Sequence, residues 1–122
     1  SEEEADDLTD ELIDRFGDPP QSVNALIQVS LLRGEATRAG ITDISQKAGY
    51  LRFELAEFDM ASVSALYGQD AYRGRVKVEA GSTPRLSLKL RSKNRILDEA
   101  RRFVGDYYEV TRASEASAAA QT

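Results

Sequence analysis

The sequence predicts an α+β fold in which helices pack on a mostly antiparallel, four-stranded sheet, in the order α-α-β-β-α-β-β-α. Three observations support this prediction. The first is that the candidate strands occur as two neighbouring pairs, and the second is that each pair is followed by a stretch with helical periodicity. The third is the size of the chain, because 122 residues with 41% apolar side chains suffice for one core.

The first helix is predicted over residues 6–16. Leu8, Leu12 and Phe16 recur four residues apart, which places them on one face of a helix. Acidic residues crowd its first turn, where the helix dipole favours negative charge, and Gly17 ends it.

The second helix is predicted to begin at the prolines that follow Asp18 and to run to Ala39. Its apolar side chains form two stripes, so it needs two packing partners. We expect the first helix on one side and the sheet on the other. One stripe comprises Val23, Leu26, Ile27, Ser30 and Leu31, and the other comprises Ala25, Val29, Leu32 and Ala36.

The first pair of strands is predicted at residues 41–47 and 50–56, with a turn between them. In the second of these strands apolar residues alternate with charged ones, which is typical of a strand with one buried face. Asp59 then caps a short helix that runs to Tyr67, and Gly68 ends it.

The second pair of strands is predicted at residues 75–79 and 85–91, as a hairpin with one buried and one basic face. A last helix follows over residues 93–110. Residues 113–122 contain no large apolar side chain, so they are expected to form a flexible tail rich in Ala and Ser. The predicted organisation is therefore a single α+β domain over residues 1–112, followed by that tail.

Composition excludes several classes of function. The chain contains no Cys and no His, which removes disulfides, thiolate metal sites and the commonest general base. No apolar run approaches the ~18 residues of a membrane span, so no membrane partner is expected. The N-terminal residues lack the basic and apolar regions of a secretory signal, and we expect a cytoplasmic protein.

Charge is unevenly distributed along the chain. The formal net charge is −5, which argues against broad binding to nucleic acids or anionic membranes. Residues 1–49 contain 11 acidic and 4 basic residues, whereas residues 50–122 contain 10 acidic and 12 basic ones. An acidic N-terminal part therefore precedes a locally basic C-terminal part.

Motifs that carry chemistry are absent from the sequence. Neither a P-loop nor a dinucleotide-binding glycine pattern occurs, and the acidic run at residues 2–7 lacks the spacing of a calcium loop. A serine nucleophile would need Lys as its base, and Ser92 beside Lys93 is the available pair. We expect no catalytic, cofactor or metal site in this chain.

Two surfaces remain as candidates for binding. Five basic residues of the second hairpin are expected to point the same way: Arg75, Lys77, Arg85, Lys89 and Arg91. That face is either a solvated surface or a contact for a nucleic acid or an acidic partner, although single-strand binding usually adds aromatic residues that this face lacks.

The first helix carries the second candidate surface. Glu11, Asp14 and Arg15 are spaced three and four residues apart, so they share one face of the helix. Such a row is either an intrahelical ion pair of little energetic value or a polar, reversible docking surface.

The string E-L-I-D-R-F-G-x-x-P, from Glu11 to Pro20, identifies a resemblance. With the apolar and small residues that follow it, this string resembles the C-terminal (TRCF) domain of the bacterial transcription-repair coupling factors, the Mfd family. The additional matching residues are Val23, Leu26, Ile27, Leu32, Arg33, Ala36, Gly40 and Ile41.

The resemblance implies a parent protein that is an ATP-dependent, helicase-like DNA translocase of transcription-coupled DNA repair. Such a parent binds DNA, RNA polymerase and the excision-repair damage-recognition ATPase, and its upstream motor hydrolyses ATP with magnesium. The C-terminal domain itself is non-catalytic, and it masks the repair-factor-binding module of the same chain. The family's polar contacts for this autoinhibition map onto Glu11, Asp14 and Arg15. The alternative function is a nucleic-acid-binding module that uses the basic hairpin face.

Overall fold

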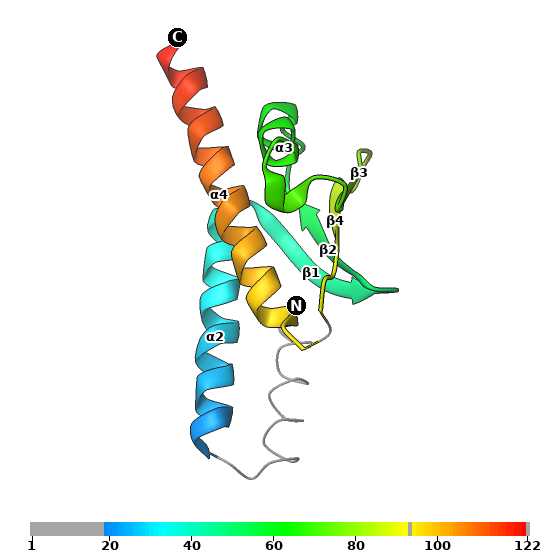
Figure 1. Ribbon diagram of the computed structural model, residues 1–122. Helices are drawn as coiled ribbons and strands as arrows, with labels where there is room; N and C mark the ends of the chain where they lie inside the picture. Colours follow the sequence, from blue (N-terminus) through cyan, green and yellow to red (C-terminus); the bar gives the residue numbers. More distant parts are fainter. Residues whose placement is uncertain (1–18, 93, 122) are drawn as a thin grey trace.

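The computed structural model describes residues 19–92 and 94–121 (Figure 1). The described elements follow one another as α2 (Pro19–Arg38), β1 (Ile41–Lys47), β2 (Tyr50–Leu55), α3 (Met60–Tyr67), the 3₁₀ turn η1 (Asp70–Tyr72), β3 (Val76–Glu79), β4 (Arg85–Lys89) and α4 (Ile96–Ala120). The α+β class and the predicted order of these elements are confirmed. The helix predicted over residues 6–16 lies outside the described residues.

The four strands form one antiparallel sheet in the order β1-β2-β4-β3. β1 with β2 and β3 with β4 are the two predicted hairpins, and they join through β2 and β4. Between the hairpins the chain crosses over through α3 and η1, so β1 and β3 become the edges of the sheet. β3 contains only four residues, and the pairing of β1 with β2 shifts its register between Ile41 and Asp43.

The turn between β1 and β2 consists of Ala48 and Gly49, as the sequence predicts. Both residues have positive φ angles, 51° and 84°. Two successive left-handed residues match the twist of a two-residue hairpin, which explains why a glycine stands at the second position.

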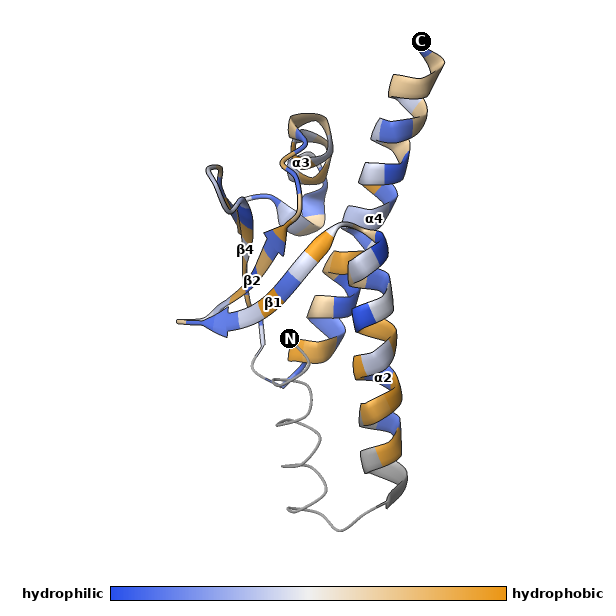
Figure 2. Ribbon diagram, turned by 180° about the vertical axis from the view of Figure 1, so that it is seen from behind, coloured by the Kyte–Doolittle hydropathy of each residue, from blue (hydrophilic) through white to orange (hydrophobic). Residues whose placement is uncertain are grey.

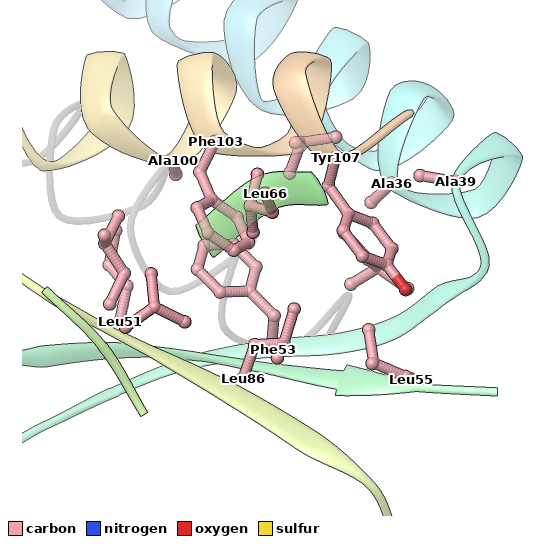
Figure 3. Packing of buried hydrophobic residues seen from close by; sticks show 14 of the residues in the cluster. Ala36, Ala39, Leu51, Phe53, Leu55, Leu66, Leu86, Ala100, Phe103 and Tyr107 are labelled. Atoms are coloured by element: carbon pink, nitrogen blue, oxygen red, sulfur yellow. The ribbon is translucent and has the colours of Figure 1, made fainter. Parts of the chain in front are cut away.

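The hydrophobic core lies between one face of the sheet and the helices (Figure 3). Phe103 of α4 is fully buried at its centre. Its ring stacks on Phe53 of β2, with the ring centroids 4.4 Å apart, and meets the ring of Tyr72 edge-on at 5.3 Å. Leu66 of α3 and Leu86 of β4 complete the centre, and both are fully buried. The core therefore ties α4 to both hairpins and to the crossover.

Helix α2 buries only one of its two predicted stripes. Val29, Leu32 and Ala36 are buried, and α2 packs mainly against α4, with a smaller contact to β1. The expectation that the sheet would be its partner on this side is thus only partly correct. α4 lies alongside α2 and separates most of that helix from the strands (Figures 1 and 2).

Helix α4 is longer than predicted. It continues through the segment expected to be a flexible tail and ends at Ala120, with Gln121 as its C-cap residue. Alanine has the highest intrinsic helix propensity, so a run rich in Ala extends a helix without burying large side chains. The hydroxyl of Ser114 in this extension donates a hydrogen bond of 2.7 Å to Oδ2 of Asp59, at the start of α3.

Candidate functional site

The predicted interface residues Glu11, Asp14 and Arg15 lie outside the described residues. The described part of the chain instead presents three surfaces next to the core: the free face of α2, the outer face of the sheet, and the end of the sheet beside the start of α4. Each includes residues that the sequence singles out.

The free face of α2 is apolar. Val23, Leu26, Ile27 and Leu31 are between 42% and 52% exposed. Figure 2 shows this apolar colouring along the N-terminal half of the helix. Among the residues described, these are four of the six exposed large apolar side chains, so the exposed apolar surface is concentrated on one helix. Its predicted partner, the helix over residues 6–16, lies outside the described residues.

The outer face of the sheet carries three of the five predicted basic residues: Lys77, Arg85 and Lys89. They alternate with buried residues of β3 and β4 and so point away from the core. Arg85 forms ion pairs with Glu54 at 3.2 Å and with Glu79 at 3.1 Å, which neutralise its charge. The ammonium group of Lys77 lies 4.7 Å from the centroid of the Tyr50 ring. This face is therefore of mixed charge rather than uniformly basic.

Arg75 and Arg91 do not share that face, so the expectation that all five basic residues point the same way is wrong. The Arg75 guanidinium turns toward the helices and pairs with Glu99 of α4, with 2.7 Å between Nη2 and Oε1. Arg75 and Arg91 both donate to the backbone carbonyl of Ala71, at 3.0 and 3.3 Å. Both residues lie just outside the strands, where the alternation of side chains no longer applies.

A pocket of about 170 Å³ opens at this end of the sheet. Its lining includes four arginines, which are Arg75, Arg91, Arg95 and Arg102. Ser92 also lines it, whereas Lys93, the base that a serine nucleophile would need, lies outside the described residues. Among the described lining residues Glu99 is the only acid, so the lining of this pocket carries an excess of positive charge.

Tyr72 forms part of the wall of this pocket and is almost fully buried. Its hydroxyl donates a hydrogen bond to Oδ2 of Asp106 in α4. Burial, together with this carboxylate, raises the pKa of Tyr72 well above its ordinary value, so the phenol stays protonated and remains a donor. The sequence places Tyr72 only in a loop, because no periodic pattern surrounds it.

A polar contact joins the start of α3 to the C-terminal half of α4. The carboxylate of Asp59 accepts hydrogen bonds from the hydroxyls of Ser62, at 2.5 Å, and Ser114, at 2.7 Å. These two bonds lower the pKa of Asp59 below its ordinary value of 3.8. Burial of Tyr107, beside this contact, raises the pKa of its phenol.

The Asp59 contact predicts a pH-dependent contribution to stability. Because the pKa of Asp59 is lower in the folded than in the unfolded chain, its contribution is present above pH 3.8 and disappears as the pH falls through the folded value. Asp59→Asn is expected to lower the free energy of unfolding by about 1 kcal/mol at pH 7 and by less at pH 3. Urea unfolding at the two pH values measures this difference. Asp70→Asn, at an exposed ion pair, is the matched control and should show no such pH dependence. A loss from Asp59→Asn that is equal at both pH values would contradict the assignment.

Within residues 19–92 and 94–121, no group of three or more acidic, His or Cys side chains is placed to hold a metal ion. In the same part of the chain, no helix is both long and apolar enough to cross a membrane.

Comparison with known protein families places the chain. The TRCF domain family matches residues 1–66, which is more than half of the 122 residues. The chain belongs to the TRCF domain family. The match therefore confirms the resemblance to the C-terminal domain of transcription-repair coupling factor. It spans α2, both strands of the first hairpin and most of α3, as well as the segment that contains Glu11, Asp14 and Arg15. No curated protein matches this TRCF domain chain.

Proposed function

We propose that this TRCF domain is a non-catalytic, autoinhibitory module of an ATP-dependent DNA translocase that acts in transcription-coupled repair. The observation that carries the proposal is the family match over residues 1–66, because it includes the helix predicted to carry the polar contacts. In this proposal, Glu11, Asp14 and Arg15 hold the domain against the repair-factor-binding module and mask it.

The fold supports such a role because it gives helix α2, which follows the predicted docking helix in the sequence, a rigid support. α2 is fixed through Val29, Leu32 and Ala36 to α4, and α4 is fixed to the sheet through Phe103. A docking helix attached to that support would move as one body with the domain. We call the proposed contact of Glu11, Asp14 and Arg15 with the repair-factor-binding module the clamp. Its release would then require only the loss of its polar contacts.

A polar interface has the strength that a reversible clamp needs. Contacts between domains of one chain resemble transient protein interfaces and are more polar than permanent ones. A coupling of about 1–3 kcal/mol between two sites changes an affinity by about 5–150-fold, which is sufficient for regulation. Charged residues provide this strength and the correct orientation without a large apolar contact.

The rest of the proposed machine lies in the parent protein. Its motor would bind ATP and magnesium and move along DNA, and its other modules would engage RNA polymerase and the damage-recognition ATPase. In the proposal this domain contributes no cofactor site and no catalytic group. It acts by covering the repair-factor-binding module until the clamp is released.

The alternative, a nucleic-acid-binding module on the basic hairpin face, is less favoured by the geometry. Arg85 is paired with Glu54 and Glu79, and Arg75 is paired with Glu99. Of the predicted cations on the outer face, Lys77 and Lys89 form no ion pair with a residue that the structure describes, and Glu54 and Glu79 share that face, so it is poorly suited to a phosphate backbone.

Alanine substitutions at the predicted contacts test the proposed clamp. In the parent translocase, Asp14→Ala or Arg15→Ala should raise the affinity for the damage-recognition ATPase by about fivefold or more, because the masked module is released. Titration of the labelled repair factor measures that affinity, and the ATPase rate of the parent is expected to rise with it.

The control for this experiment is Arg112→Ala, which removes a charge from the exposed, C-terminal part of α4. It should leave both the affinity and the ATPase rate unchanged. The melting temperature of the isolated chain should be the same for all of these variants. Wild-type affinity and ATPase rate in both the Asp14→Ala and the Arg15→Ala protein would overturn the assignment of the interface.

A further inference from the structure

The pocket at the end of the sheet is formed by residues far apart in the sequence. Arg75 stands immediately before β3, and Arg91 follows the end of β4. Arg95 is the N-cap residue of α4, and Arg102 lies seven residues, or about two helical turns, further along the same face. The fold thus brings four guanidinium groups from three places in the chain to one cavity of about 170 Å³.

One of these arginines, Arg75, uses its donors in contacts within the fold. Arg75 donates to the carbonyls of Lys89 and Ala71 and to Glu99, at distances between 2.7 and 3.2 Å. The side chains of Arg75 and Glu99 are only 15% and 16% exposed, and Glu99 also accepts the backbone N–H groups of Arg91 and Ser92. This ion pair forms one wall of the pocket, and its two opposite charges neutralise each other.

The other three arginines keep donors for a ligand. The side chain of Arg91 makes one hydrogen bond, to the carbonyl of Ala71. Arg102 approaches Asp106 only at 4.0 Å, and that carboxylate already accepts the hydroxyl of Tyr72. The side chain of Arg95 forms no hydrogen bond or ion pair with any residue that the structure describes. All three side chains are exposed at the mouth of the pocket, so a group entering it would meet three cations that the described lining residues leave uncompensated.

We infer that this pocket binds a phosphate group. A guanidinium presents several N–H donors in a planar fork that matches the oxygens of phosphate, and such charge-assisted bonds are about twice as strong as neutral ones. Three guanidinium groups on different elements suit a tetrahedral group, whose oxygens point in several directions. Leu88 and the buried ring of Tyr72 form an apolar part of the wall, where reduced access of water strengthens the electrostatic attraction.

The inferred site is independent of the proposed clamp. It lies on residues 71–102, whereas the clamp is assigned to Glu11, Asp14 and Arg15. Its ligand is a free phosphate ion or the terminal phosphate of a nucleic-acid strand, which share the same chemistry. The clamp experiment and the phosphate experiment can therefore fail separately.

Titration of the whole 122-residue chain with inorganic phosphate tests the inference. At constant ionic strength, with chloride as the replaced anion, we expect saturable shifts of the Nε–Hε signals of Arg95 and Arg102 in NMR spectra. The double variant Arg95→Gln/Arg102→Gln should weaken phosphate binding about tenfold or more, because each lost charge-assisted bond is worth at least a factor of this order.

The control is Arg38→Gln/Arg112→Gln, which removes the same two charges from exposed positions outside the pocket. It should change phosphate affinity less than about twofold, because only long-range attraction is reduced. Equal weakening in the two double variants, or shifts with wild-type chain that fail to saturate, would overturn the site.

Single-stranded DNA with and without a 5′-phosphate distinguishes the two sources of phosphate. A preference of about tenfold for the phosphorylated strand, abolished by inorganic phosphate, would support a strand end as the ligand. Saturation by inorganic phosphate without such a preference would support the free ion. The site would be contradicted if inorganic phosphate did not saturate the chain and if strand binding depended neither on the 5′-phosphate nor on added inorganic phosphate.

Discussion

Phe103→Ala is expected to lower the free energy of unfolding by about 3–5 kcal/mol, the largest single effect that the fold predicts. Phe103 is fully buried and contacts three other aromatic rings, of which Phe53 stacks on it at 4.4 Å between centroids. Removing the ring leaves a cavity between α4 and β2 that these large neighbours fill poorly.

A loss of that size approaches the total stability of many domains, so a large part of the variant would be unfolded at 37 °C. Urea unfolding followed by circular dichroism measures it. Phe103→Leu keeps most of the volume and should cost less than half as much, whereas Met60→Ala, at a side chain that is 63% exposed, should cost about 0.5 kcal/mol or less. A Phe103→Ala variant that is as stable as Met60→Ala would show that the core is not centred on this ring.

Glu99→Gln is expected to have the second-largest effect, a loss of about 2–3 kcal/mol. The substitution leaves the Arg75 guanidinium without its counter-ion, in a position where that side chain is only 15% exposed. Removing one partner of a fully buried pair costs about 3–5 kcal/mol, and the residual contact with water here reduces that cost.

A double variant separates the charge from the packing. Arg75→Met/Glu99→Leu removes both charges and should recover part of the stability lost by Glu99→Gln alone, because no isolated charge remains. Glu79→Gln is the exposed control, since its partner Arg85 keeps a second carboxylate, and it should cost about 0.5 kcal/mol or less. Urea midpoints provide all of these values. Equal, small losses for Glu99→Gln and Glu79→Gln would show that solvent screens the Arg75 pair.

The elements of this fold could be predicted because their signals are local. The pairs of strands are visible as alternation of apolar and polar residues on either side of a turn, and the first strand begins and ends where expected, at Ile41 and Lys47. The order of strands in the sheet could not be predicted in this way. It depends on the pairing of β2 with β4, which joins Phe53 to Leu86 across more than thirty residues.

The basic residues of the second hairpin were only partly predictable. Alternation holds inside a strand, so the outward positions of Lys77, Arg85 and Lys89 follow from it. Arg75 lies just before β3, where its direction is decided by Glu99 in α4, a residue with which it shares no local pattern. A pocket assembled from strand ends and a helix start therefore appears only in three dimensions.

The C-terminal helix shows a different limit of sequence reasoning. The prediction ended it where large apolar side chains stop, at Val110, because burial is the usual source of helix stability. The structure continues it to Ala120, with a hydrogen bond from Ser114 to Asp59 on the way. Helix propensity, rather than amphipathic spacing, was the signal for this extension. The predicted interface residues Glu11, Asp14 and Arg15 stay predictions.

The two edge strands of the sheet, β1 and β3, have a consequence for solubility. An unpaired strand is a template on which a second chain can add its own backbone, and repeated addition leads to amyloid-like assemblies. Here the pairing of edge strand β1 is interrupted by the register shift between Ile41 and Asp43, and edge strand β3 has only four residues. Neither edge strand provides a long, flat ladder of free N–H and C=O groups, so the addition of strands from further copies is disfavoured.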